Sequence, residues 1–236
     1  MKQILELIEY RKQEFSQLPF FEYLRDKNID PRQKLTFAPV ISPLAMGFGE
    51  LCKEVFRKEP TNDRVQELIN KHTYEEHYHW LWLLEDMEKL GLDQTMRFSE
   101  ALKFIWSPNT KSNRFVCSLF ERYAFQADPL LKLVVIQVAE VTGNVFFYET
   151  KKVAQQLHEI TKEEYRYFGM CHMDKEINHN LNRSEVVSYL NEIQINEETR
   201  MQATEIVEQL FDAFTDVVDE YLVYATKEHQ KQLVLQ

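Results

Sequence analysis

Hydrophobic residues recur at intervals of three and four along nearly the whole chain, which is the pattern of amphipathic helices. The first such stripe predicts a helix over residues 2–17, and a short second helix begins in the sequence LPFFEYL. Asp30 followed by Pro31 predicts the N-cap and first position of a third helix. Because Pro43 has no amide hydrogen to donate, this helix should be interrupted or bent near the sequence VISPLAMGFG.

The remaining pattern is also helical. The sequence EPTNDRVQELI opens a long helix that continues to EKLGLD, where Gly91 is expected to cap the C-terminus. Further helices are predicted over about residues 94–106, 112–127, 129–158, from 184 onward, and 197–228. The sequence TKEE at 161–164 is a capping box that predicts one more. No strand pattern competes, so we expect one all-α domain of eight to ten helices, bundle-like at its centre.

Composition narrows the class of protein. Of 236 residues 44% are hydrophobic and only five are glycine, and neither a dinucleotide-binding nor a P-loop motif is present. The net charge of −10 argues against a nucleic-acid partner. The three cysteines form no CxxC pair, which favours a reducing compartment. The N-terminal segment does not resemble a signal peptide and no apolar run approaches 18 residues, so we expect a cytoplasmic protein outside the membrane.

Two segments carry the candidate chemistry. HTYEEHYHW begins at His72 and HMDKEINH begins at His172, and both contain the spacing His-x3-Glu-x2-His. A helix turns by about 100° per residue, so each set projects from one face within a wedge of roughly 60°. Neutral imidazoles and carboxylates without thiolates suit iron, manganese or zinc. The predicted metal ligands are His72, Glu76, His79, His172, Glu176 and His179.

A third helix supplies the expected bridging carboxylate. Residues 130–139 are almost entirely apolar, and Glu140 interrupts them on a stripe of core-type residues. An isolated buried charge is costly, and a metal ion would be its partner. Glu76 and Glu140 are therefore the predicted catalytic carboxylates. Tyr165 is a candidate redox-active or supporting phenol, although a packed core tyrosine explains it too, and Cys171 is interpreted as a small buried residue.

Each histidine cluster alone could be a solvated polar face, but two copies together with Glu140 favour a metal site. These features also resemble a known family. HTYEEHYHW, AEVTGNVFF and YFGMCHMDKEINH, on three helices, are similar to the haem-oxygenase-like superfamily, which includes TenA thiaminase-type proteins and pyrroloquinoline-quinone synthase. The nearest branch is the iron-containing redox enzymes called haem-oxygenase-like di-iron oxidases. The resemblance covers about residues 15–225.

The resemblance implies a homodimer that uses two iron ions to activate O2 and oxidise a small molecule, such as a fatty acid or an amino-acid derivative. It assigns Glu76 and His79 to the first ligand set, Glu140 to the second, and His172, Glu176 and His179 to the third. His72 departs from the pattern, because some members carry a carboxylate there. The aromatic residues expected to line a substrate pocket are Phe120, Phe146, Phe147, Phe168 and Tyr165, although core packing explains them equally well.

Two other functions compete with this one. A TenA-like hydrolase of thiamin-type compounds would need a cysteine nucleophile, for which Cys117 and Cys171 are available. A non-catalytic helical protein that binds a metal or a partner is the other alternative. Haem oxygenase itself is disfavoured, because that activity needs an axial histidine near the N-terminus and no histidine precedes His72.

Overall fold

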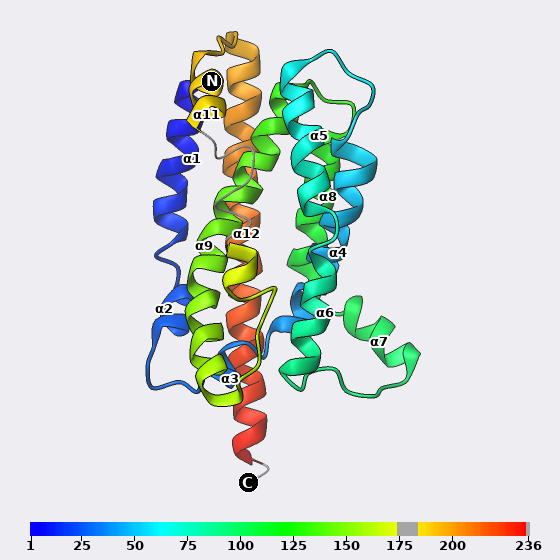
Figure 1. Cartoon of the computed structure of the whole chain (residues 1–236), viewed down its shortest axis with the longest axis vertical. Coiled ribbons are helices and arrows are strands. Elements are labelled where there is room, and N and C mark those ends of the chain that lie inside the picture. The colour runs from blue at the N-terminus through cyan, green and yellow to red at the C-terminus, as the bar shows by residue number, and fades with distance from the viewer. Residues whose placement is uncertain (174–183, 235–236) are drawn as a thin grey trace.

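The computed structural model describes residues 1–173 and 184–234, and every regular element within them is helical (Figure 1). The all-α prediction is confirmed, although the described residues hold eleven α-helices where eight to ten were expected. Their bounds are α1 Lys2–Phe15, α2 Pro19–Arg25, α3 Pro31–Lys34, α4 Ala38–Leu51, α5 Arg64–Glu76, α6 Trp80–Lys89, α7 Phe98–Ile105, α8 Lys111–Ala124, α9 Pro129–Thr161, α11 Ser184–Glu192 and α12 Glu197–Val234.

The helices form two layers. In one layer, α9 and α12 run side by side and α1 packs against both (Figure 1). In the other, α4 packs against α6 and α8, and a π-helical turn at Cys52–Phe56 joins α4 to the segment before α5. The contacts of α8 with α9 and α12, and of α5 with α9, join the layers. The candidate site lies at this junction.

Helix α9 is the apolar centre of the fold. It is long and apolar enough to cross a membrane by length and composition, with a window of mean hydropathy 1.6. However, 61% of that window is buried within the protein, as expected for the core helix of a bundle. Glu140 and Glu149 are the buried acids on this helix, and Glu149 faces α2, where Arg25 donates to it at 3.2 Å.

The first long helix of the prediction is in fact two. Asp63 accepts from the amide of Gln66 as the expected N-cap, and Gly91 has the positive φ of a C-terminal cap. Between these ends, residues 77–79 form a turn that separates α5 from α6. Helix α4 passes this turn closely. A Cβ atom at Gly49 would lie 2.9 Å from the carbonyl oxygen of His77, so a larger residue would push α4 and the turn apart.

Two other boundaries differ from the prediction. The break expected at Pro43 occurs earlier, at residues 35–37, and Pro43 lies inside α4. The capping box at 161–164 does not start a helix, because Thr161 is the last residue of α9 and Lys162 takes a left-handed conformation. The hydroxyl of Thr161 instead donates back to Leu157 and accepts from the amide of Glu163. Residues 162–169 are consequently not helical.

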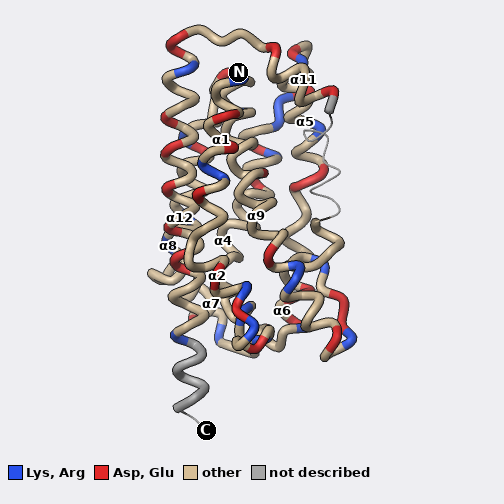
Figure 2. The backbone as a smooth tube through the Cα atoms, turned by 90° about the vertical axis from the view of Figure 1, so that its left-hand side faces the viewer, with Lys and Arg blue, Asp and Glu red and all other residues tan. Residues whose placement is uncertain are grey.

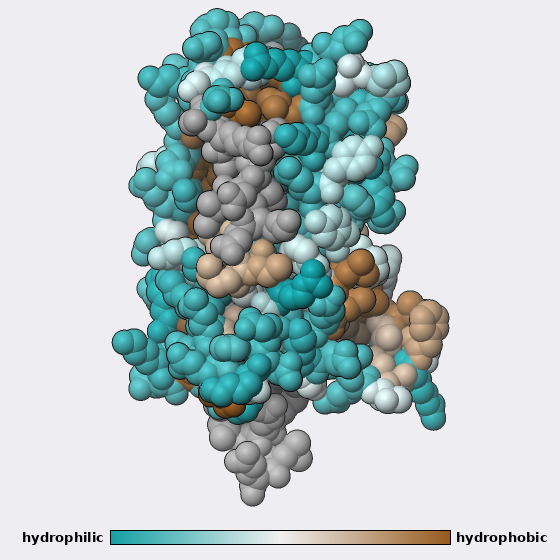
Figure 3. All heavy atoms as spheres, in the orientation of Figure 1, coloured by the Kyte–Doolittle hydropathy of each residue, from teal (hydrophilic) through white to brown (hydrophobic). Residues whose placement is uncertain are grey.

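The surface is uneven in its polarity. Figure 2 shows acidic and basic positions interspersed along the helices. In Figure 3 hydrophobic residues reach the surface where α6 adjoins α7, a helix with no buried side chain. The largest exposed hydrophobic residues of this region are Leu81, Leu84, Phe98, Leu102 and Trp106.

Candidate metal centre

Helices α5 and α9 bring the first two acidic groups to a histidine. The inner face of α5 packs toward α9, so His72 and Glu76 are buried, and Glu140 of α9 is buried opposite them. His72 is fully buried, and its Nε2 lies 3.4 Å from Oε1 of Glu140. A neutral imidazole with a carboxylate is a common ligand pair for iron, manganese and zinc.

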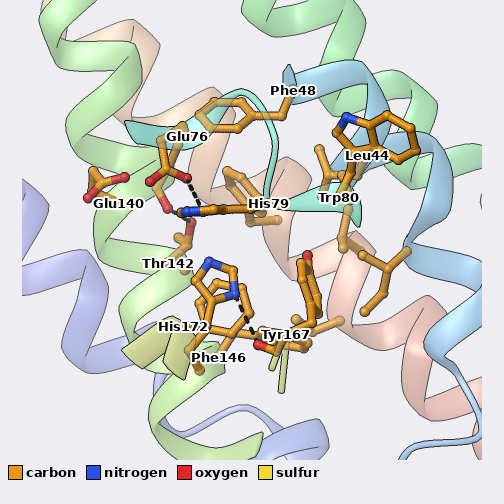
Figure 4. Close-up of a pocket in the computed structure, with 18 of the residues that line it drawn as sticks. Leu44, Phe48, Glu76, His79, Trp80, Glu140, Thr142, Phe146, Tyr167 and His172 are labelled. Atoms are coloured by element: carbon orange, nitrogen blue, oxygen red, sulfur yellow. Dashed lines mark hydrogen bonds and ion pairs between the residues drawn. The ribbon is translucent and has the colours of Figure 1, made fainter. Parts of the chain in front are cut away.

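His79 lies beside the carboxylate of Glu76 although the helix has ended. Its amide donates to the carbonyl of Glu76, and its Nδ1 lies 3.0 Å from Oε2 of the Glu76 side chain. The ring of Trp82 stacks on that of His79 with centroids 4.3 Å apart. The turn at 77–79 and this stacking hold the imidazole in place. Figure 4 shows it beside Glu76.

A tight turn precedes the second histidine cluster in the chain. The fully buried carboxylate of Asp86, on α6, accepts from the amides of Arg166, Tyr167 and Phe168 at 2.8–3.0 Å. Within this turn a Cβ atom at Gly169 would lie 2.1 Å from the carbonyl oxygen of Tyr165, so only glycine fits.

His172 follows this turn, and its orientation is fixed by a backbone group. Its Nδ1 lies 2.9 Å from the carbonyl oxygen of Tyr167. A carbonyl only accepts, so Nδ1 carries the proton and the lone pair of the neutral ring is on Nε2. Partners of this kind set the tautomer and orientation of metal-binding histidines. The ring centroids of His172 and His79 lie 4.6 Å apart.

The five buried side chains form two groups of possible ligands that share one residue. His72, Glu76 and Glu140 form the first group, and Glu76, His79 and His172 the second. Within each group, one ligand atom per residue lies within 4.8 Å of the others. With metal–ligand bonds of about 2.1 Å, two ligands of one ion are at most about 4.2 Å apart, so only small side-chain adjustments are needed. Each group could therefore hold a metal ion, and Glu76 is common to both.

An apolar cavity of about 130 Å³ adjoins these groups. Glu76, His79, Glu140 and His172 gather at its polar end, and Leu44, Phe48 and Phe146 lie along its walls (Figure 4). The remaining lining comes from α1, α4, α6, α8, α9, α12 and the 162–169 segment, and consists of Phe15, Ile41, Ala45, Trp80, Phe120, Ala139, Thr142, Gly143, Phe147, Tyr167, Phe214, Val217, Val218 and Tyr221.

Five of the seven predicted ligands thus meet in the fold: His72, Glu76, His79, Glu140 and His172. The other two, Glu176 and His179, lie outside the described residues. Phe120, Phe146 and Phe147 line the cavity as expected, whereas Phe168 does not.

Tyr165 does not line the cavity, and its predicted catalytic role has no support in the structure. It is buried, and its hydroxyl lies 3.3 Å from that of Thr161. Helical periodicity would relate it to His172, but residues 166–169 between them are not helical. Tyr167, two residues later, lines the cavity instead. The tyrosine-rich lead-in marked the segment, but periodicity alone could not distinguish Tyr165 from Tyr167, and a catalytic role for Tyr165 stays a prediction.

Two of the three cysteines, Cys52 and Cys117, are poorly suited to nucleophilic chemistry. All three are unpaired with one another. Burial raises the pKa of the Cys117 thiol to about 12, and burial, followed by the charges of Glu76 and Glu140, raises that of Cys52 well above its ordinary value. A cysteine nucleophile needs the opposite shift. Cys171 is exposed, so its interpretation as a buried residue was wrong.

No family model matches the chain, and no curated protein is similar to it by sequence comparison. The resemblance to the haem-oxygenase-like superfamily therefore stays a prediction, and the geometry described above carries the functional argument.

Proposed function

We propose that this protein is a non-haem, O2-dependent oxidase or oxygenase that holds two iron ions and acts on a small organic molecule. The observation that carries the proposal is a pair of buried His/Glu groups that share Glu76 and border an apolar cavity. The haem-oxygenase-like fold, the cytoplasmic location and the homodimer expected from the resemblance belong to the same proposal.

The donor set supports iron, and manganese or zinc would suit the same ligands. Glu76 and Glu140 supply two negative charges to balance the cations, and three neutral imidazoles add none. Zinc has no redox chemistry, so iron is the metal that matches an oxidative function. When bound, iron would supply open coordination positions for O2 and the electrons that reduce it.

The protein's own contributions are positioning and exclusion of water. The turn held by Asp86 fixes His172 through the carbonyl of Tyr167, and stacking on Trp82 fixes His79. The aromatic and aliphatic cavity walls keep water from the reacting groups, so the oxidant would meet the substrate. Glu76, because it belongs to both groups, would couple the two ions.

The proposal is tested by O2 uptake. Metal-free protein is loaded with Fe(II) without oxygen, mixed with oxygenated buffer, and followed with an oxygen electrode. We expect a fast, protein-dependent uptake that Glu140→Ala and His79→Ala remove. His158→Ala is the matched control, because that side chain is 44% exposed and belongs to neither ligand group. This variant should behave as the wild type.

Uptake unchanged by Glu140→Ala and His79→Ala would refute the proposal. Stable metal binding without oxygen consumption would favour the non-catalytic metal-binding alternative. Of the two cysteines available to a TenA-like hydrolase, Cys117 is disfavoured because burial raises the pKa of its thiol, whereas Cys171 is exposed.

A further inference from the structure

The walls of the cavity next to the metal groups offer no countercharge to an anion. Among the described residues that line it, the charged side chains are Glu76 and Glu140, and no lysine or arginine is present. A carboxylate entering this space would lose its hydration beside two acids. The transfer of an unpaired charge into an apolar environment is among the most unfavourable steps in protein energetics.

Two hydroxyl groups of the wall are also unsuited to a carboxylate. The hydroxyl of Tyr221 donates to Oδ1 of Asn113 at 2.6 Å, and that of Thr142 donates to the carbonyl of Val138 at 2.9 Å. A hydroxyl has one proton to donate, so these two present only lone pairs to a ligand. They would accept from a neutral hydroxyl or amine, whereas a carboxylate needs donors.

The volume limits the ligand further. The cavity measures about 130 Å³. An engineered protein cavity of about 150 Å³ with apolar walls binds benzene, so a molecule of ring size is the appropriate scale. Phe48, Phe120, Phe146 and Phe147 border the space, and their ring faces and edges suit an aromatic or compact aliphatic ligand.

We infer that the cavity takes a neutral, largely apolar molecule of about the size of one aromatic ring, and that it discriminates against carboxylate anions. The inference rests on the proposed function in one respect: the molecule is the substrate only if the protein is an oxidase or oxygenase. It differs from the fatty acids and amino-acid derivatives that the family resemblance implies, both of which carry a carboxylate.

The test measures binding rather than turnover. Metal-free protein in EDTA is titrated with p-cresol and, separately, with benzoate at pH 7 by isothermal titration calorimetry. We expect p-cresol to bind roughly tenfold or more tightly than benzoate, because only the anion loses hydration without a partner. The titrations are repeated after loading with Zn(II), which has no redox chemistry and cannot consume the ligand.

A variant tests whether the ligand binds in the cavity. Gly143 lines the cavity, and a Cβ atom there would meet only Phe147, at 3.8 Å, which is an ordinary contact. Gly143→Leu should fill the space and weaken p-cresol binding roughly tenfold or more. Gln155→Leu adds a similar side chain at an exposed position of α9 and should change nothing. Gly143→Ala is the smaller step if the leucine variant does not fold.

Two results would overturn the inference: benzoate binding as tightly as p-cresol to the metal-free protein, or p-cresol affinity unchanged by Gly143→Leu. Failure of the metal proposal would be distinct, because the metal-free titrations do not depend on it. Discrimination between p-cresol and benzoate in protein that binds no metal would leave the cavity assignment intact and reject the oxidase.

Discussion

Glu76 is the residue on which the site depends. It is buried, contacts His79 at 3.0 Å, and belongs to both groups of possible ligands. The spacing in the sequence identified it, because His-x3-Glu-x2-His predicts one polar face. The sequence could not show that His72 contacts Glu140, 68 positions away, at 3.4 Å. That contact depends on how α5 packs against α9.

Cysteine reactivity separates the oxidase from the hydrolase alternative. Cys171 is exposed, whereas Cys52 is buried and the pKa of Cys117 is raised from 9.0 to about 12 by burial. Because the thiolate is the reactive form, we expect Cys171 alone to react quickly with a disulfide reagent such as DTNB at pH 8. In denaturant all three should react.

The control is Cys171→Ser, which should remove the fast phase, whereas Cys117→Ser should retain it. Loss of the fast phase in Cys117→Ser would contradict the assignment and revive a cysteine nucleophile. The pKa shift of Cys117 also has a consequence for stability. Between about pH 9 and 12 the thiol ionises in the unfolded chain but stays protonated in the folded one. Stability should therefore fall as the pH rises through this window.

At the scale of helices and turns, the main error was the prediction of one continuous helix where α5 and α6 are separate; the long helices α9 and α12 are continuous as expected. A helical face of His72, Glu76 and His79 was expected, and the three side chains do gather, but α5 ends at Glu76. The amide of His79 bonds to the carbonyl of Glu76, so the turn keeps the histidine close to the position that a helix would give. Local spacing thus predicted the contact correctly although the element was wrong.

The segment before His172 shows why local patterns are insufficient. The sequence TKEE matches a capping box, yet the fold uses Thr161 to end α9 and forms a turn over 166–169. That turn is held by Asp86, which lies 80 positions before Arg166 in the chain. No local rule can anticipate a bond of this range, so both the turn and the placement of Tyr167 were missed.

Replacement of Asp86 tests how much the turn before His172 contributes to stability and metal binding. Asp86→Asn replaces one acceptor oxygen by an NH2 group, so at least one amide of the turn loses its partner. We expect the free energy of unfolding to fall by roughly 1–3 kcal/mol, because a buried amide without an acceptor is costly. The same variant should bind Fe(II) more weakly, since the turn positions His172. Urea denaturation and anaerobic Fe(II) titration measure the two effects.

The neighbouring Glu85 offers a matched control. It pairs with Arg166 at the surface, where both side chains are 43% exposed. Exposed ion pairs contribute about 0–1 kcal/mol, so Glu85→Gln should change stability and Fe(II) affinity little. If Asp86→Asn matched Glu85→Gln in both measurements, Asp86 would have no positioning role.

At the scale of the whole molecule, the helical class could be predicted and the cavity could not. Periodicity of three and four identifies helices from the chain alone. The cavity walls come from seven parts of the chain, including Phe15 of α1 and Tyr221 of α12, and their meeting is decided by packing. The apolar stripes of these residues are also ordinary core patterns. Nothing in the sequence marks which of them border a space.

The proposed function requires one chain to hold two ions that share Glu76. The number of metal ions bound per chain tests this requirement directly. Anaerobic equilibrium dialysis against Fe(II) should give about two ions per wild-type chain. His72→Ala and His172→Ala, each in a different group, should each lower the affinity of one ion. Glu76→Gln, with unchanged helical circular dichroism, should weaken both. A wild-type chain that binds one ion or none, or a Glu76→Gln chain that binds two as tightly, would contradict the claim.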